Sequence, residues 1–387
     1  MAKTKRNKDG YYVAYPTIGH RVNEQGNTVP IRRKFYARTK KELTAKIDQF
    51  KQDQRNGIER SDTAFGILAD GWIQEFFMCD GSLKDSTKLR YFDAWQRSIK
   101  PLPLYHTRLD EVTARTIQSA YNQLISDGTP ISEIKQAHKL MRRLYQYIEM
   151  EKLGRDVTGP VKIPKEKTNK ANEEITVWTD EEIRTILNSF DKADSRFRHR
   201  FLLVLAYYTG CRKSELLALT YDDITADGGV RITKTLADCT DGIKNGKMVS
   251  RLDVTDPKSN SSIRTVPIDP VVLDELRRHR AWHLEEQLRN NYRTDYIFTT
   301  DSGEFYDPKN LDRALTRYYK RIGIEPKPMH TYRHTYGTNL CKNGVSIETA
   351  SSLMGHADIS TTAKYYVNVS EDAKQAAAMT LRLALDA

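Results

Sequence analysis

The sequence predicts a multidomain α+β protein, in which a small basic sheet with one helix, a helical domain, and a mainly α-helical domain with a small antiparallel sheet follow one another. Three observations predict it. The chain has 387 residues, too many for one ordinary core, so two or three domains are expected. Near residue 62 the apolar spacing changes from strand-like to helical. Residues 154–173 then contain Gly, Pro and Lys without apolar periodicity, which is typical of a linker.

The overall charge indicates a polyanionic partner. Lys and Arg number 62 against 51 Asp and Glu, which gives a net charge of +11. This balance favours nucleic acid over an acidic small substrate. No apolar run approaches the roughly 20 residues of a membrane span, and "MAKTKRNKDG" lacks the apolar core of a signal peptide. We therefore expect a cytoplasmic protein.

The cysteines indicate neither a disulfide framework nor a thiolate zinc site, because they lie far apart without C-x-x-C spacing. We interpret them as reduced thiols. They are Cys79, Cys211, Cys239 and Cys341.

Residues 1–58 predict a small basic domain. They hold fourteen Lys and Arg residues against five Asp and Glu. The stretches "YYVAY" (11–15) and "VPIRRKFYAR" (29–38) have strand-like content, and "NEQGN" between them is typical of a turn. A basic, aromatic β surface can enter a DNA groove, although a basic tail without a specific partner is an alternative. The candidate DNA contacts are Arg32, Arg33 and Lys34.

One helix is expected to cover the other face of this sheet. Thr39 and Glu42 form a capping box at its start. Leu43, Ile47 and Phe50 then repeat at helical spacing, which predicts a buried stripe.

Residues 62–153 predict a compact domain of four helices. Apolar residues recur there in four stripes, and stripes at this spacing are nearly always core. Basic residues on the opposite faces are either solvated or in contact with DNA, and the sequence leaves both open. The stripes are Phe65, Leu68, Trp72 and Phe76; Leu89, Phe92 and Ile99; Ile117, Tyr121 and Leu124; and Ile134, Ala137, Met141, Leu144 and Ile148. The candidate DNA contacts are Lys88, Lys139 and Arg143.

The last predicted domain, residues 174–387, begins near a second capping box. Thr179 and Glu182 make this box and open a helix. A nearly all-apolar helix follows, and Gly210 breaks it. The next short helix is entered through Arg212, a position poorly suited to packing.

The middle of this domain predicts a small sheet. "GGVRITKT" and "SSIRTVPI" are strand-like, and the polar turn "DPKSNSS" is expected to present Lys258 at a hairpin tip.

The end of the domain predicts four helices. In "HTYRHTYGTNL", His330 and Arg333 share a helix face. "SLMGHADISTTAKYY" ends one helix at Gly355, shows His356, and starts another that carries Tyr365 and Tyr366. Residues 370–387 predict a C-terminal helix capped by Ser370.

Each of these residues has an ordinary structural explanation when taken alone, but the ordered set resembles the tyrosine recombinase (phage integrase) family. The resemblance is carried by T-G-C-R-K-S-E-L around Arg212, Lys258 on a turn, H-x-x-R at 330–333, and G-H at 355–356 followed nine residues later by Tyr365. It covers residues 174–370 by motif. The helical domain is similar, more loosely, to the core-binding domain of the family. Residues 1–58 look like the arm-type DNA-binding domain of integrases from conjugative transposons and some phages.

The residue types suit phosphodiester transfer. Arg212 and Arg333 can each grip phosphate oxygens through paired N–H donors. His356 can donate another hydrogen bond, while His330 can either donate one or accept the proton of the nucleophile. Tyr365 would be the nucleophile, since a phenol with a pKa of about 10 needs a base or cationic charge nearby. Glu215, three residues after Arg212, could orient that arginine.

The resemblance implies a metal- and ATP-independent DNA strand transferase with no cofactor. Its product would be a 3′-phosphotyrosine with a free 5′-hydroxyl, and Lys258 resembles the lysine that protonates the leaving 5′-oxygen. The partners would be double-stranded DNA at core and arm sites, a homotetramer formed through the C-terminal helix, and excision and DNA-bending factors. We expect a mobile-element integrase in the bacterial cytoplasm, associated with the nucleoid.

Alternatives exist for the nucleophile, for the histidine pair and for the function. The family spacing selects Tyr365 over Tyr366, which a helix turns about 100° away. His330 and His334 have zinc-ligand spacing, but the glutamate of H-E-x-x-H is absent and Arg333 would place a positive charge beside the ion, so His334 is better interpreted as a core or helix-supporting residue. The alternative functions are chromosome or plasmid dimer resolution, a type IB topoisomerase, and a catalytically inactive DNA-binding protein.

Overall fold

The computed structural model describes residues 5–6, 10–22, 28–55, 63–165, 175–190, 197–257 and 259–365. The chain divides into two compact units. The N-terminal unit contains Met1–Lys167 and Gly242–Met248. The C-terminal unit contains Thr168–Asp241 and Val249–Ala387. None of the described helices is both long enough and apolar enough to cross a membrane.

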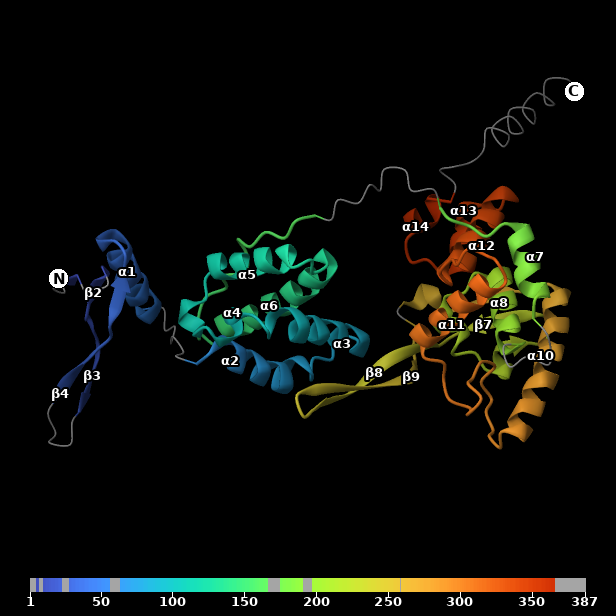
Figure 1. Cartoon of the computed structure of the whole chain (residues 1–387), viewed down its shortest axis with the longest axis horizontal. Helices are drawn as coiled ribbons and strands as arrows, with labels where there is room; N and C mark the ends of the chain where they lie inside the picture. Colours follow the sequence, from blue (N-terminus) through green and yellow to red (C-terminus); the bar gives the residue numbers. More distant parts are fainter. Residues whose placement is uncertain are drawn as a thin grey trace, which may run out of the picture. The chain divides into compact units, whose positions relative to one another are not determined.

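The first part of the N-terminal unit is a pair of small antiparallel sheets with one helix (Figure 1). The predicted capping box is confirmed, since the amide of Glu42 donates to Oγ1 of Thr39 over 3.2 Å. Ala14 and Phe35 pack against Leu43 and Phe50 of the helix, as the apolar stripe predicted. The turn expected at 23–27 lies outside the described residues. The elements are β1 (Lys5–Arg6), β2 (Tyr12–Ala14), β3 (Thr17–Val22), β4 (Thr28–Arg32), β5 (Phe35–Ala37) and α1 (Lys40–Arg55). The sheet orders are β1-β2-β5 and β3-β4.

The second part of the N-terminal unit is helical and has its own core. The four predicted stripes lie on its helices, and most of their residues are buried. Its elements are α2 (Phe65–Trp72), η1 (Ile73–Phe77), α3 (Asp85–Ala94), η2 (Trp95–Ile99), α4 (Pro103–His106), η3 (Leu109–Glu111), α5 (Ala114–Ser126) and α6 (Ile131–Met150).

One residue of the first stripe was predicted wrongly. Phe76 is 49% exposed, and Phe77 is buried in its place. The reason is the π-helical segment η1, in which each turn takes more residues than in an α-helix, so the buried face moves one position along the chain. A prediction from the regular 3.6-residue period of an α-helix cannot include this shift.

The predicted linker is packed over its first part. Thr158 is buried, and Val157, Val161 and Ile163 pack against the helical core. The amide of Lys162 also donates to Oε1 of Gln118 over 2.8 Å. Residues 154–163 therefore follow the helical domain, while residues 166–173 lie outside the described part.

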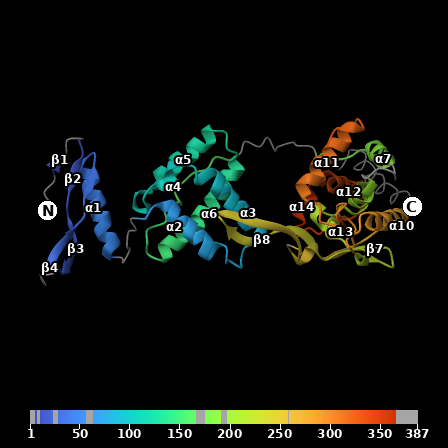
Figure 2. The same ribbon diagram turned by 60° about the horizontal axis from the view of Figure 1, so that its bottom comes forward.

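The C-terminal unit contains a group of helices, one small antiparallel sheet, and a two-stranded ribbon except for its residues 242–248, which belong to the N-terminal unit (Figure 2). One sheet has the order β10-β7-β6, and β8 pairs with β9 in a long ribbon. The strands are β6 (Ile224–Thr225), β7 (Gly229–Ile232), β8 (Thr235–Lys244), β9 (Lys247–Thr255) and β10 (Arg264–Pro267). The helices are α7 (Asp180–Asn188), α8 (Arg198–Thr209), α9 (Lys213–Leu216), η6 (Tyr221–Asp223), η7 (Asn260–Ser262), α10 (Pro270–Arg289), α11 (Pro308–Arg321), α12 (His330–Lys342), α13 (Ile347–Met354) and α14 (Ser360–Ala363).

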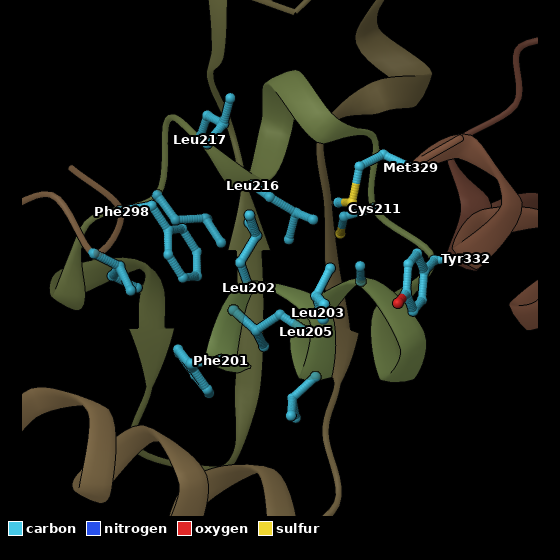
Figure 3. Close-up of a cluster of buried hydrophobic side chains, with 14 of the residues drawn as sticks. Phe201, Leu202, Leu203, Leu205, Cys211, Leu216, Leu217, Phe298, Met329 and Tyr332 are labelled. Carbon is cyan, nitrogen blue, oxygen red and sulfur yellow. The ribbon is translucent and has the colours of Figure 1, made fainter. Parts of the chain in front are cut away.

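Helix α8 forms the centre of the C-terminal unit, which explains why it is apolar on nearly every side. Both α10 and α12 pack against it. Figure 3 shows Leu202, Leu203 and Leu205 of α8 among Leu216 and Phe298. The capping box that opens α7 is confirmed, with the amide of Glu182 donating to Oγ1 of Thr179 over 3.1 Å.

The predicted hairpin around Lys258 is wrong in its pairing. The strand before it, β9, pairs with β8, whereas the strand after it, β10, pairs with β7. The segment 256–263 therefore joins two different sheets, and Lys258 itself lies outside the described residues. The β8–β9 ribbon was not predicted.

Candidate active site

A turn at a glycine positions Arg212 at the start of α9. Helix α8 ends at Gly210, whose φ of 59° is left-handed. A Cβ on this residue would lie 2.3 Å from the ring of Tyr336, so only glycine fits the turn. The chain then enters α9 with Arg212 at the N-cap position, which confirms the predicted break and entry.

The side chain of Arg212 is held on two sides. Its Nη1 donates to Oε1 of Glu215 over 2.6 Å, and its Nη2 donates to the carbonyl oxygen of Gly355 over 3.1 Å. Glu215 is buried and also receives Nη2 of Arg264 over 2.9 Å. Burial alone would raise the pKa of Glu215, but the hydrogen bond and charge of Arg264, with further contributions from Arg212, lower it. Glu215 is therefore a carboxylate that orients Arg212.

Arg333 is the second guanidinium of the site. It is 1% exposed, and it donates to the carbonyl oxygens of Gly210 over 2.9 Å and Met354 over 2.5 Å. Burial, followed by the positive charge of Arg212, lowers the pKa of Arg333 to about 10. It therefore remains a cation at neutral pH, and the two arginines are close enough for their charges to repel each other.

His356 follows a second left-handed glycine. Helix α13 ends at Gly355, with a φ of 65°. The next residue, His356, has Nδ1 2.8 Å from Oγ1 of Thr362, a contact that fixes one edge of its ring. Burial and the charges of Arg333 and Arg212 lower the pKa of His356 to about 4, so the imidazole is neutral.

Tyr365 lies against α12. Its side chain is 5% exposed, and its Oη is 2.8 Å from Nδ1 of His334. Nζ of Lys364 lies 5.1 Å from the centre of the phenol ring. Burial raises the pKa of Tyr365, and the charge of Arg333 opposes this effect. The alternative nucleophile, Tyr366, lies outside the described residues.

His330 lies one helical turn before His334. The two rings meet edge to face with centroids 4.6 Å apart. Burial and the charges of Arg333, Lys364 and Arg212 lower the pKa of His330. In the described part of the chain, no group of three or more His, Cys, Asp or Glu side chains could hold a metal ion.

Comparison with protein families decides the class of the protein. The model of the phage integrase family matches residues 176–372. The chain belongs to this family. A "Tyrosine recombinase XerC-like" protein of Caldanaerobacter subterraneus subsp. tengcongensis is 32% identical over an alignment of 393 positions, which covers 98% of this chain and 98% of that one. The chain is thus a tyrosine site-specific recombinase, as the sequence motifs predicted.

Solved structures share the fold of this recombinase. The Tn1549 transposon integrase in complex with circular intermediate DNA matches with a TM-score of 0.60 and 18% identity, over 82% of this chain and 99% of that one. A lambda integrase dimer bound to a core site matches with a TM-score of 0.56 and 16% identity, over 94% of each chain. These likenesses support the mostly helical fold with small antiparallel sheets.

The structure brings together five of the six predicted catalytic residues of the recombinase and the predicted orienting residue. The charges of Arg212 and Arg333 both lower the pKa values of His330 and His356, and the charge of Arg333 also acts on Tyr365, so these five side chains form one cluster. Glu215 contacts this cluster through Arg212. The sixth residue, Lys258, is outside the described part of the chain.

The predicted DNA-contacting residues differ in their exposure and in their contacts. The predicted surface position of Lys88 is wrong, because it is 6% exposed and its ammonium donates to the carbonyl oxygen of Met78 over 2.7 Å. Arg33 is half-buried and pairs with Asp110 over 2.6 Å. Nη1 of Arg143 pairs with Asp80 over 2.7 Å.

Three of the predicted DNA contacts have the expected exposure. Arg32 and Lys34 are exposed near Tyr36, whose side chain is also exposed. Lys139 is exposed on α6. These three remain candidates.

The sequence did not identify two residues that contact the predicted catalytic groups. Arg264 comes from β10 and binds Glu215, and no motif or periodicity marked it. His334 carried one signal, its position one helical turn after His330, but we interpreted it as a core or helix-supporting residue. Its Nδ1 lies 2.8 Å from Oη of Tyr365, so it contacts the predicted nucleophile.

Proposed function

We propose that this recombinase integrates and excises a mobile element by cleaving and rejoining double-stranded DNA through Tyr365. The observation that carries the proposal is the placement of a buried phenol beside a cluster that contains Arg212, Arg333 and His356. Breaking one phosphodiester needs a nucleophile and cationic donors for the non-bridging oxygens, and this cluster supplies both.

The proposed chemistry keeps the number of phosphate bonds constant. Oη of Tyr365 gives its proton to an imidazole of the site and attacks phosphorus: the Oη–H bond breaks, the Oη–P bond forms, and the bond from phosphorus to the 5′-oxygen breaks. The product is a 3′-phosphotyrosine and a 5′-hydroxyl, whose proton we assign to Lys258. A second 5′-hydroxyl then attacks the phosphotyrosine and releases the phenol, so the strand is resealed without ATP.

The arginines have donors left for the phosphate. Arg333 uses one N–H for Gly210 and one for Met354, and a guanidinium carries five. The backbone contacts fix its plane, so the remaining donors are preorganised before DNA binds. Arg212 is oriented in the same way by Glu215, and neutral His356 can add a hydrogen bond through Nε2.

We also propose a role for each part of the chain. Residues 1–58 bind arm-type DNA sites, residues 62–153 bind the core site, and residues 154–173 connect them to the catalytic part, residues 174–387. The exposed Arg32, Lys34 and Tyr36 support the first assignment. The structure of a lambda integrase tetramer bound to a Holliday junction, with a TM-score of 0.54, supports a homotetramer on DNA, and we assign residues 370–387 to its contacts.

The test uses a duplex from the ends of the element that carries the gene, with a 5′-bridging phosphorothiolate at the cleavage position. The wild-type chain should form a covalent adduct that survives denaturation, and peptide mapping should place the DNA on Tyr365. Tyr365→Phe should bind the duplex with unchanged affinity and form no adduct. An adduct that persists in this variant would move the nucleophile elsewhere.

Resolution of chromosome or plasmid dimers is the second candidate function, because it uses the same cleavage and rejoining of DNA by a tyrosine recombinase. Excision of a marked element from a plasmid, compared with resolution of plasmid dimers that carry a single site, separates the two tasks. Relaxation of a supercoiled plasmid without any recombination site would instead indicate a topoisomerase.

A further inference from the structure

The phenol of Tyr365 lies in a cradle on α12. His330 lies three residues before Arg333 and four before His334, and Gly337 lies four after Arg333 and three after His334, so these residues gather on one side of the helix. A Cβ on Gly337 would lie 3.1 Å from Cε2 of Tyr365, so the absence of a side chain there lets the ring approach the helix. In this position the phenolic Oη lies 2.8 Å from Nδ1 of His334.

The surroundings of His334 make it a hydrogen-bond acceptor. The charged and titratable groups that face it are His330 and Arg333 on its own helix, and Lys364 next to Tyr365. Burial and these groups lower the pKa of His334 to about 4. The imidazole is therefore neutral at pH 7, and with its proton on Nε2 it accepts the phenolic O–H at Nδ1.

Binding of DNA should favour the protonated form of His334. A phosphodiester held by Arg212 and Arg333 brings a negative charge into the cluster, which offsets the cations that disfavour an imidazolium at His334. His334 thereby becomes a better proton acceptor when a phosphate is in place for attack. The surplus of positive charge in the free protein keeps Nδ1 unprotonated until then.

We propose that His334 is the general base of this recombinase: it takes the proton of Tyr365 as Oη attacks phosphorus and returns it when the strand is rejoined. The proposal rests on the proposed function. In cleavage the phenolic O–H bond breaks, the Oη–P bond forms, the bond from phosphorus to the 5′-oxygen breaks, and Nδ1 gains the proton as an imidazolium. In rejoining these changes run backwards, and the imidazolium protonates the departing phenol.

The geometry favours His334 over His330 in this role. In the described part of the chain, His334 makes the hydrogen bond to the reacting oxygen, whereas His330 contacts the ring of His334 edge to face. His330 is thereby left as a donor to the phosphate, one of the two roles that the sequence left open.

The test separates proton transfer from positioning. Asn places its carbonyl oxygen near the position of Nδ1, so His334→Asn keeps an acceptor that cannot take a proton, whereas His334→Ala removes the acceptor. Single-turnover cleavage is measured from pH 6 to 9.5 for the wild type, both variants and His330→Asn. Each duplex is used with an ordinary phosphodiester and with a 5′-bridging phosphorothiolate, whose thiolate leaves without a proton. Melting temperature and duplex affinity are measured for every variant.

A general base predicts that His334→Asn and His334→Ala lose about 10²- to 10³-fold in cleavage rate at pH 7. The loss should have the same size on the phosphorothiolate, because removal of the phenolic proton does not depend on the leaving group. It should shrink by about tenfold for each pH unit as phenolate forms on its own. Replacing Tyr365 with a ring-fluorinated, more acidic tyrosine should restore most of the rate in His334→Asn and change the wild type little.

Three outcomes would overturn the assignment. Near-wild-type cleavage by His334→Asn would reduce His334 to a positioning residue. A loss that disappears on the phosphorothiolate would make it an acid for the leaving group. A loss that the acidic tyrosine does not restore would make it structural. If the wild type forms no adduct at Tyr365, the proposed function itself fails, which the same gels distinguish from these outcomes.

Discussion

Glu215 and Arg264 form a buried ion pair in which Oε2 and Nη2 are 2.9 Å apart, and both side chains are 5% exposed. The same carboxylate holds Nη1 of Arg212 over 2.6 Å. Arg264 also donates to the carbonyl oxygen of Leu353, close to the end of α13. Glu215 therefore connects the position of Arg212 to the packing of β10 against α13.

Replacement of Glu215 should affect both stability and catalysis. Glu215→Gln leaves Arg264 buried without a counter-charge, so we expect a loss of about 3–5 kcal/mol in the free energy of unfolding, measured in urea. Single-turnover cleavage should also fall, because Arg212 loses its orienting partner. The matched control is Glu275→Gln, which breaks a pair with Arg200 between α10 and α8. The control should lose stability and keep its cleavage rate in the folded state. Unchanged cleavage by Glu215→Gln would contradict the orienting role.

Substitution of two glycines should show whether the turn at Gly355 matters for catalysis. Gly355 and Gly344 both have a left-handed φ, of 65° and 72°. A Cβ on Gly355 would lie 2.9 Å from Nη1 of Arg264, whereas a Cβ on Gly344 meets nothing within 4 Å. Gly344→Ala should cost about 1–2 kcal/mol from backbone strain and leave cleavage unchanged. Gly355→Ala should lower the melting temperature further and slow cleavage, because it displaces Arg264. Equal effects of the two changes on cleavage would show that this contact does not matter.

Replacing Arg333 with lysine should destabilise the protein more than replacing Arg212 with lysine. Arg333→Lys leaves a buried carbonyl of Gly210 or Met354 without its donor, which costs about 1–3 kcal/mol. Arg212 is 36% exposed, so Arg212→Lys should leave the melting temperature nearly unchanged. Both variants should cleave at least tenfold more slowly, because each loses one bidentate contact with the phosphate. Thermal melts and single-turnover assays on the same preparations check this; an equal loss of stability would contradict the burial argument.

Stability should fall below pH 6.5 because several histidines have lowered pKa values in the folded protein. His334 and His356 of the site are two of them, and His279 and His283 of α10 are two more. Burial lowers the pKa of His279 to about 3 and, together with the charge of Arg198, that of His283 to about 4. The unfolded chain binds protons at a pKa of about 6.5, so it gains protons before the folded state does. The stabilisation is present above pH 6.5, decreases as the pH falls, and levels off near the folded pKa values. At pH 5 the loss should be about 2 kcal/mol for each of these two histidines of α10.

Urea unfolding at pH 7 and pH 5 measures this dependence. His283→Gln can keep hydrogen bonds to Tyr221 and Thr299 without titrating, and it should remove about 2 kcal/mol of the loss, the contribution of one histidine. An unchanged dependence in this variant would assign the effect to other groups.

Removal of divalent metal should leave cleavage intact. In the proposed mechanism Arg212 and Arg333 supply the positive charge at the phosphate, so the reaction does not need a metal ion. Single-turnover rates in EDTA and in Mg²⁺ should agree within about twofold once ionic strength is matched. A strong loss in EDTA that added Mg²⁺ restores would require a metal in the chemical step.

Local chemistry explains what could be predicted from the sequence. The capping boxes at Thr39 and Thr179 and the glycine stops at Gly210 and Gly355 depend on residues within one helical turn, so their patterns are complete in the sequence. The π-helical segment at 73–77 was missed because a single extra residue in a turn leaves no mark in a 3.6-residue period. The β8–β9 ribbon was missed because many of its residues are half-exposed and carry little apolar alternation.

By itself, the sequence determined the family and the ordered set of chemical groups, since reactive side chains and their spacing are properties of the chain. Only the tertiary structure decided which groups meet. His334 and Tyr365 are 31 positions apart, and Glu215 and Arg264 are 49 apart. Such contacts depend on how α12 packs against α13 and how β10 packs against α13, and packing is set by the whole core rather than by any local pattern.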